Sequence, residues 1–271
     1  MSTTLEWLEP DGLGGFASGT VDLARTRRYH ALLMRAVDTP ARRFALVNGI
    51  DVFVRTPEGR FALSAQRNQS GVTTPDGSAF VKSFSAEPWP TWVFTLPCGR
   101  VVQQEIFVPH GRVATVLIWT VFGSNAGCSL EVRPFLSGRE LDSLHHEDDA
   151  FRFEPEQIGD VQLWRPYDGV PIIVIKTASV YRHEPRWNRG FLYEDERACG
   201  LDNSEDLASP GIFNWDFVFG RATFILASPD QADGLGSELL SYSTSDLVKR
   251  LSAAERDRRA VLGEPLTLSS V

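Results

Sequence analysis

The feature that most constrains the fold is a long succession of short, β-rich apolar runs separated by turn residues. Up to residue 228, turn signals recur about every 8 to 12 residues, and the runs between them are rich in Val, Ile, Phe and Trp. This spacing is typical of antiparallel sandwiches and barrels, because βαβ units would need helical runs between the strands. Roughly a dozen to sixteen candidate strands are too many for one small sandwich. We therefore predict an all-β fold of two large, packed antiparallel sheets.

Particular dipeptides and tripeptides mark the expected turns. Asn48-Gly49 predicts a tight hairpin, because both residues tolerate positive φ. Further turns are expected at Pro57-Glu58-Gly59, Pro97-Cys98-Gly99, Pro109-His110-Gly111 and Gly220.

The opening stretch WLEPDGLGGFASGTVDLARTRRYHALLMRA, residues 7–36, holds two motifs. Gly12 to Ala17 formally matches a dinucleotide fingerprint, but that motif needs a helix after it, and the residues that follow are β-branched and broken by glycine. We expect a tight turn between strands instead. Arg27 to His30 should then begin a strand, with Arg27 and Tyr29 on one face and Arg28 and His30 on the other. These side chains would contact a sugar, or pair with an internal carboxylate and the backbone.

The pattern changes near Pro229. Residues 244–263 place Leu247, Leu251, Ala254, Val261 and Leu262 on one helical face, with Thr244 or Ser245 as the N-cap and Gly263 at the end. A weaker helical pattern covers Gln231 to Leu240. We divide the chain into a β-domain, residues 1–228, and a helical linker, residues 229–271. The alternative is a terminal helix packed on a sheet.

Composition excludes several classes of protein. A net charge of −8 is unlike the basic surface of a general nucleic-acid binder. The sequence has no apolar run of the roughly 18 residues that a membrane helix needs, and no secretory signal, so we expect a cytoplasmic protein with no membrane partner. Cys98, Cys128 and Cys199 lack metal spacing and are expected to be reduced thiols. His145-His146 points to opposite sides of an extended chain, so we expect a solvated loop and no metal site. No cofactor motif stands out.

An acidic segment is the main candidate for chemistry. Six carboxylates lie between Glu194 and Asp206. Glycoside hydrolysis uses a carboxylic acid and a carboxylate on either side of the scissile bond, and such a cluster could supply both. The alternatives are a solvated acidic loop or neutralisation of Arg27 or Arg28. Trp187 and Tyr193 nearby would stack on a sugar ring or belong to the core.

Three segments, in order, resemble the N-terminal domain of bacterial and archaeal-type glycogen debranching enzymes. They are EWLEPDGLGGFASGTVDLARTRRYHALL, RPFLSGRELDSLHHED and YEDERACGLDNSEDLASPGIF. The sequence departs from the family pattern at Glu140-Leu141, where Asp and an aromatic residue are expected, and at Ala198-Cys199. These departures bear on ligand contacts at those positions and leave the family resemblance intact.

The resemblance implies a large antiparallel β-supersandwich, similar to the N-terminal domain of bacterial glucoamylases, followed by a helical linker. In the family an (α/α)6 barrel then carries the amylo-α-1,6-glucosidase chemistry, and this sequence holds no such barrel. We therefore expect a non-catalytic domain that supports the barrel and binds branched α-glucan such as glycogen, limit dextrin or maltooligosaccharide. We assign no catalytic residue. The residues expected to face the ligand are Asp11, Arg27, Tyr29, His30, Trp187, Asn188, Glu194 and Asp206.

Two other functions fit the sequence. An aldose-mutarotase-like enzyme of similar fold would use His30 or His183 as acid and Glu194 as base. A stand-alone carbohydrate-binding module would need neither a barrel nor a catalytic pair. An isolated domain would expose the apolar surface meant for the barrel, which is compatible with a homodimer.

Overall fold

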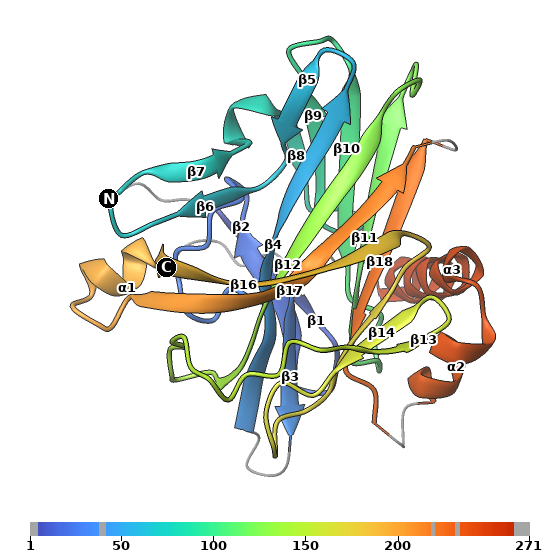
Figure 1. Ribbon diagram of the computed structural model, residues 1–271. Helices are drawn as coiled ribbons and strands as arrows, with labels where there is room; N and C mark the ends of the chain where they lie inside the picture. Colours follow the sequence, from blue (N-terminus) through green and yellow to red (C-terminus); the bar gives the residue numbers. More distant parts are fainter. Residues whose placement is uncertain (1–4, 38–41, 218–219, 231–233, 263–271) are drawn as a thin grey trace.

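The structure, a computed structural model, describes residues 5–37, 42–217, 220–230 and 234–262. It consists of two eight-stranded antiparallel sheets, a small hairpin and short helices (Figure 1). This confirms the all-β supersandwich with C-terminal helices.

Sheet 1 has the strand order β1-β2-β3-β4-β12-β17-β16, with β5 paired to β4. Its strands are β1 (Glu6–Pro10), β2 (Phe16–Thr20), β3 (Leu33–Val37), β4 (Arg42–Thr56), β5 (Gly59–Ala62), β12 (Ser129–Glu140), β16 (Val180–Leu192) and β17 (Ser204–Asp216).

Sheet 2 has the strand order β13-β14-β15-β18-β11-β10-β9-β8. Its strands are β8 (Val81–Ser85), β9 (Thr91–Thr95), β10 (Val101–Phe107), β11 (Ala114–Phe122), β13 (Glu156–Ile158), β14 (Val161–Trp164), β15 (Ile173–Lys176) and β18 (Arg221–Ala227). The separate hairpin pairs β6 (Ala65–Arg67) with β7 (Thr73–Asp76), and the 3-10 turn η1 (Ser78–Phe80) follows it.

The main core lies between the two sheets, and a second core lies on the outer face of sheet 2. Strand β11 contributes to both, because its side chains alternate: Leu117 faces sheet 1, and Val116 faces the helices. Burial on both faces explains the nearly continuous apolar sequence of β11.

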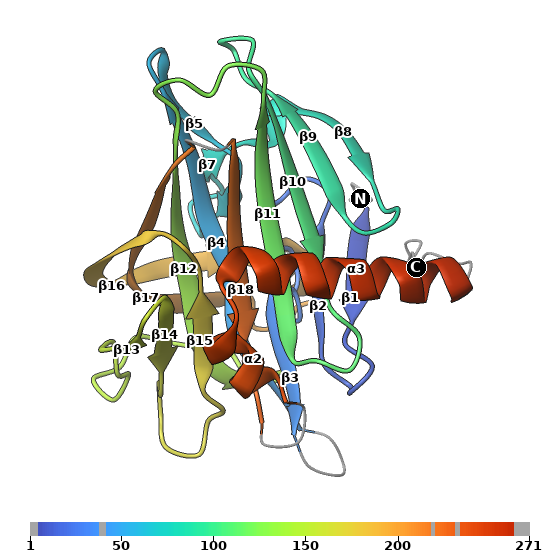
Figure 2. The same ribbon diagram turned by 90° about the vertical axis from the view of Figure 1, so that its right-hand side faces the viewer.

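The helices are α1 (Glu194–Ala198), α2 (Leu235–Ser241) and α3 (Thr244–Leu262). Helix α3 lies across the outer face of sheet 2 (Figure 2), and Leu247, Val248 and Leu251 are buried there. The predicted apolar face is correct for Leu247 and Leu251 but wrong for Ala254, which is exposed, and for Val261, which is 86% exposed. The Leu262 side chain and the predicted end at Gly263 lie outside the described residues. The predicted cap is one residue late, because the hydroxyl of Ser243 accepts the Asp246 N–H, whereas Thr244 donates to Asp160.

Two local predictions are wrong, at Asn48-Gly49 and at Arg27 to His30. Asn48-Gly49 forms no hairpin, and β4 runs through it without a turn. Arg27 to His30 forms a turn before β3 instead of its first residues: the His30 N–H donates to the Arg27 carbonyl, and His30 Nδ1 accepts the N–H of Thr26. The turns at residues 57–59, 97–99 and 109–111 and at Gly220 lie where expected.

The glycine-rich motif forms the turn between β1 and β2, and a strand follows it instead of a helix. Asp11 Oδ1 accepts the N–H groups of Leu13 and Gly15 at 2.6 and 2.9 Å. Gly15 also lies against sheet 1, since a Cβ there would stand 2.3 Å from the Met34 carbonyl oxygen. The motif therefore allows close backbone packing, as expected, and forms no phosphate-binding loop.

Candidate functional site

A polar cleft of about 940 Å³ lies between the β6–β7 hairpin, η1, helix α1 and the loop after β2. The hairpin and α1 lie on the same side of the molecule, at the left of Figure 1. Charged residues of both signs line the cleft: Asp22, Arg25, Arg67, Asp76, Glu194, Asp195 and Arg197.

Arginines pair with the carboxylates of α1 in the cleft. Glu194 Oε1 lies 2.9 Å from Arg67 Nη2 and 3.4 Å from Arg197 Nη2. Asp195 Oδ2 lies 3.7 Å from Arg27 Nε. On the other side of α1, Glu196 pairs with Arg28 at 3.5 Å. Neutralisation of Arg27 and Arg28 by the acidic segment is thus confirmed.

Glu6, on β1, binds three of the predicted residues next to the cleft. Its carboxylate accepts from Arg27 Nε at 2.9 Å and from the Tyr29 hydroxyl at 3.0 Å, and His30 Nε2 lies 3.6 Å away. The contact with His30 and then the Arg27 and Tyr29 donors hold the pKa of Glu6 at about 2, although its burial acts in the opposite direction. Burial lowers the pKa of His30, so a neutral ring with its proton on Nε2 fits this geometry.

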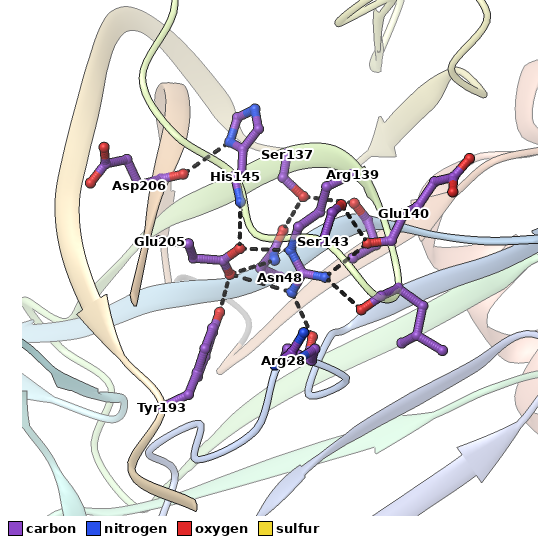
Figure 3. A network of polar contacts seen from close by, with 12 residues as sticks. Arg28, Asn48, Ser137, Arg139, Glu140, Ser143, His145, Tyr193, Glu205 and Asp206 are labelled. Carbon is purple, nitrogen blue, oxygen red and sulfur yellow. Dashed lines mark hydrogen bonds and ion pairs between the residues drawn. The ribbon is translucent and has the colours of Figure 1, made fainter. Parts of the chain in front are cut away.

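A buried polar network links strands β4, β12 and β17 near the cleft (Figure 3). Glu205, which is fully buried on β17, accepts from Arg139 Nε at 2.6 Å, from Asn48 Nδ2 at 3.0 Å, and from the Tyr193 hydroxyl. Burial opposes ionisation of Glu205, but the charge and hydrogen bonds of Arg139, the charge of Arg25 and the Tyr193 hydrogen bond together outweigh it and lower the pKa of Glu205. Since Tyr193 directly precedes α1, the network positions that helix from β4, β12 and β17.

The structure does not bring all the predicted ligand-facing residues together. Glu194 lines the cleft, and Arg27 and Tyr29 adjoin it through Asp195 and Glu6. His30 is next to them but has no exposed surface. Asp11 is 2% exposed and holds the β1–β2 turn.

The remaining three residues lie along β16 and β17 beside the 142–153 loop. Trp187 packs on His145 and Phe151, with ring centroids 5.2 and 5.5 Å apart. Asp206 accepts the Gly190 N–H at 2.9 Å, and Asn188 donates to the Leu207 carbonyl at 3.4 Å. Trp187, Asn188 and Asp206 therefore make contacts within the fold.

The histidine predictions need a correction. His145 does not lie in a solvated loop: it is 7% exposed, and its ring contacts the Asp206 carbonyl and the Tyr167 hydroxyl. His146 is exposed. Within the described ranges, no group of three or more His, Cys, Asp or Glu side chains is arranged to hold a metal.

The two histidines proposed for mutarotase chemistry contact carboxylates other than Glu194. His30 contacts Glu6, and His183 Nε2 lies 3.1 Å from Glu154. The described part of the chain contains no helix that is long and apolar enough to cross a membrane.

Sequence reasoning missed Glu6, Arg25 and Arg67. Nothing local marks them: Glu6 precedes its partners by a whole hairpin, and Arg67 lies on a three-residue strand. The resemblance did cover the segments around Arg139 and Glu205, but it gave no sign that the two form a pair.

Comparisons with known proteins identify one family. A scan against protein-family models matches residues 5–222 to the family described as glycogen debranching enzyme N terminal. A search of curated proteins finds no match. Among solved structures, a bacterial glucoamylase complexed with acarbose is similar, with 10% identity and a TM-score of 0.43, over 95% of this chain and 36% of that one. The chain thus spans about a third of the length of the glucoamylase.

Proposed function

This chain belongs to the family of glycogen debranching enzyme N-terminal domains, and on that premise we propose that it is a non-catalytic, cytoplasmic domain that binds branched α-glucan. The observation that carries the binding proposal is the mixed-charge cleft beside α1.

The chemistry of the cleft suits a neutral polyol. Each sugar hydroxyl both donates and accepts hydrogen bonds, and the cleft offers ionic acceptors such as Glu194 together with ionic donors such as Arg67 and Arg197. Its volume of about 940 Å³ is at the upper end of the range for small-molecule sites, which suits more than one sugar unit.

The same ion pairs support a non-catalytic role. Hydrolysis of a glycosidic bond needs one protonated carboxyl group as general acid. The carboxylates of Glu194 and Asp195 are instead engaged in ion pairs with Arg67 and Arg27. Bond cleavage would then belong to a catalytic domain outside this chain.

We extend the proposal to the division of the chain. Residues 1–228 would form the sandwich, and residues 229–271 would lead toward an (α/α)6 barrel. Strand β18 ends at Ala227, and α3 packs on sheet 2, so the linker would start from a fixed position. The homodimer expected from exposed apolar surface stays a prediction.

Isothermal calorimetry with maltooligosaccharide and limit dextrin tests the proposal, since no tryptophan is among the described residues that line the cleft. We expect binding by the wild type and about a tenfold loss of affinity, or about 1.4 kcal/mol, in Glu194→Gln and Arg67→Met. Arg152→Met is the matched control, because its exposed pair with Asp168 lies outside the cleft.

Two results would contradict the proposal. Absence of binding heat at millimolar sugar would remove the glucan site. Release of glucose from limit dextrin by this chain alone, at a rate typical of enzymes, would remove the non-catalytic role.

A further inference from the structure

A second feature, separate from glucan binding, is the buried guanidinium of Arg25. This residue follows β2 and is 8% exposed. Its Nη1 donates to the Tyr193 hydroxyl and its Nη2 to Gln66 Oε1, both at 3.2 Å. Its Nε has no hydrogen-bond partner among the described residues. The guanidinium carbon lies 4.9 Å from the centre of the Phe191 ring.

Among the described residues, Arg25 forms no ion pair within 4 Å, although its charge acts at longer range to favour the ionised forms of Glu205 and Asp51. Both of its hydrogen-bond acceptors are neutral. The buried carboxylate of Glu205 pairs with Arg139 at 2.6 Å and is linked to Arg25 by hydrogen bonds through Tyr193. Asp51 is likewise one residue away, since it accepts from Gln66 Nε2 at 3.2 Å. A buried charge without a partner is costly, because the interior solvates it poorly.

A cavity of about 70 Å³ adjoins Arg25, between the two sheets. It is much larger than the roughly 15 Å³ that one water needs, so it has room for a small ion with water. Gly49 helps to open this space, because a Cβ there would lie 3.1 Å from Arg25 Nε.

The walls of the cavity are mostly apolar, and none of the described lining residues is acidic. Arg25 is the one charged member among them. The polar members are Ser18, Thr20, Asn48, Ser64, Gln66 and Gln104. Ser18, Thr20, Asn48 and Gln66 already donate hydrogen bonds within the fold. The Ser64 hydroxyl and the Gln104 amide are the other lining groups that can donate to an anion beside Arg25.

We propose that this cavity binds one small monovalent anion, of the size and charge of chloride, against the Arg25 guanidinium. One negative charge balances the positive charge of Arg25, and a volume of about 70 Å³ suits a small ion. The anion would stabilise the fold and the loop after β2. The inference does not depend on glucan binding in the neighbouring cleft.

Thermal unfolding in chloride and in gluconate, at a fixed ionic strength of about 0.15 M, tests the site. A ligand that binds only the folded state raises Tm with the logarithm of its concentration. We expect Tm in chloride to exceed Tm in gluconate by about 5 °C.

Two variants locate the effect. Arg25→Met should lose the chloride dependence, and its Tm in gluconate should equal or exceed that of the wild type, since the unpaired charge is gone. Arg67→Met removes an arginine that lines the cleft but not the cavity, and this variant should keep the chloride dependence of Tm. Loss of glucan binding in Arg67→Met together with retained chloride dependence would separate the two sites.

Crystals of the wild type soaked in bromide give a readout that needs no variant. We expect an anomalous peak beside the Arg25 guanidinium. Equal Tm in the two salts, or an Arg25→Met protein that still responds to chloride, would overturn the proposal, and so would bromide crystals without a peak in the cavity.

Discussion

At the scale of single residues, two acidic side chains that are far apart in sequence organise the region around the cleft. Glu6 holds Arg27, Tyr29 and His30, and Glu205 holds Arg139, Asn48 and Tyr193. The sequence predicted that Arg27 to His30 mattered and offered pairing with an internal carboxylate as one explanation. It could not identify Glu6 as that carboxylate, because the contact depends on how β1 lies beside the turn before β3.

Glu6 should make folding stability depend on pH. Its pKa is about 2 in the folded protein, against an ordinary value of 4.5, so its contribution is present above pH 4.5 and is lost as pH falls toward 2. We expect Glu6→Gln to lower the free energy of unfolding by about 2–3 kcal/mol at pH 7. Urea unfolding of both proteins across this range measures the difference, which should shrink steadily below pH 4.5. A difference that is the same at pH 7 and near pH 2 would be inconsistent with this role.

At the scale of elements, the sequence predicted the strands and α3 well because these depend on local patterns of apolar residues. It misjudged Asn48-Gly49, since the same dipeptide suits a hairpin turn and a polar contact inside a strand. Asn48 bonds Glu205, and Gly49 leaves room for Arg25, so the pair serves the interior and β4 continues through it. The strand continues because Asn48 and Gly49 contact Glu205 on β17 and Arg25 in the loop after β2. These partners are distant in sequence, so no local pattern could reveal them.

The turn between β1 and β2 offers a test of close packing. We expect Gly15→Ala to destabilise the protein by about 2–3 kcal/mol, because the new Cβ would collide with the Met34 carbonyl, which belongs to the sheet and cannot move freely. Gly99→Ala is the control, since its φ is +81° but nothing lies within 4 Å of the new Cβ. It should cost about 1 kcal/mol, from backbone strain alone. Chemical denaturation gives both values, and equal costs would mean that packing at Gly15 is unimportant.

At the scale of the whole molecule, α3 connects the two sheets. Its apolar face covers sheet 2, while Arg259 in its last turn pairs with Glu9 on β1 and donates to the Pro88 carbonyl. Glu9 is 5% exposed, and burial raises its pKa, so it depends on Arg259 as its counter-charge. The helix is therefore held at its C-terminal end as well as along its apolar face.

Removing that attachment should loosen one end of α3 without unfolding the sandwich. In Arg259→Met, we expect amide hydrogen exchange over residues 252–261 to accelerate about tenfold, equivalent to about 1.4 kcal/mol. Lys249→Met is the matched control, because its pair with Asp246 is exposed and should contribute little. Unchanged exchange in the Arg259 variant would show that the apolar face alone holds the helix.

Arg25 and Thr20 belong to the walls of both the cleft and the internal cavity. Because these two residues line both spaces, an occupant of one would change the affinity of the other. If an anion in the cavity changes the affinity of the cleft for sugar by some factor, sugar in the cleft changes the affinity for the anion by the same factor. The affinity of this domain for sugar would then depend on the anion in the buffer, and its affinity for the anion would depend on the sugar concentration.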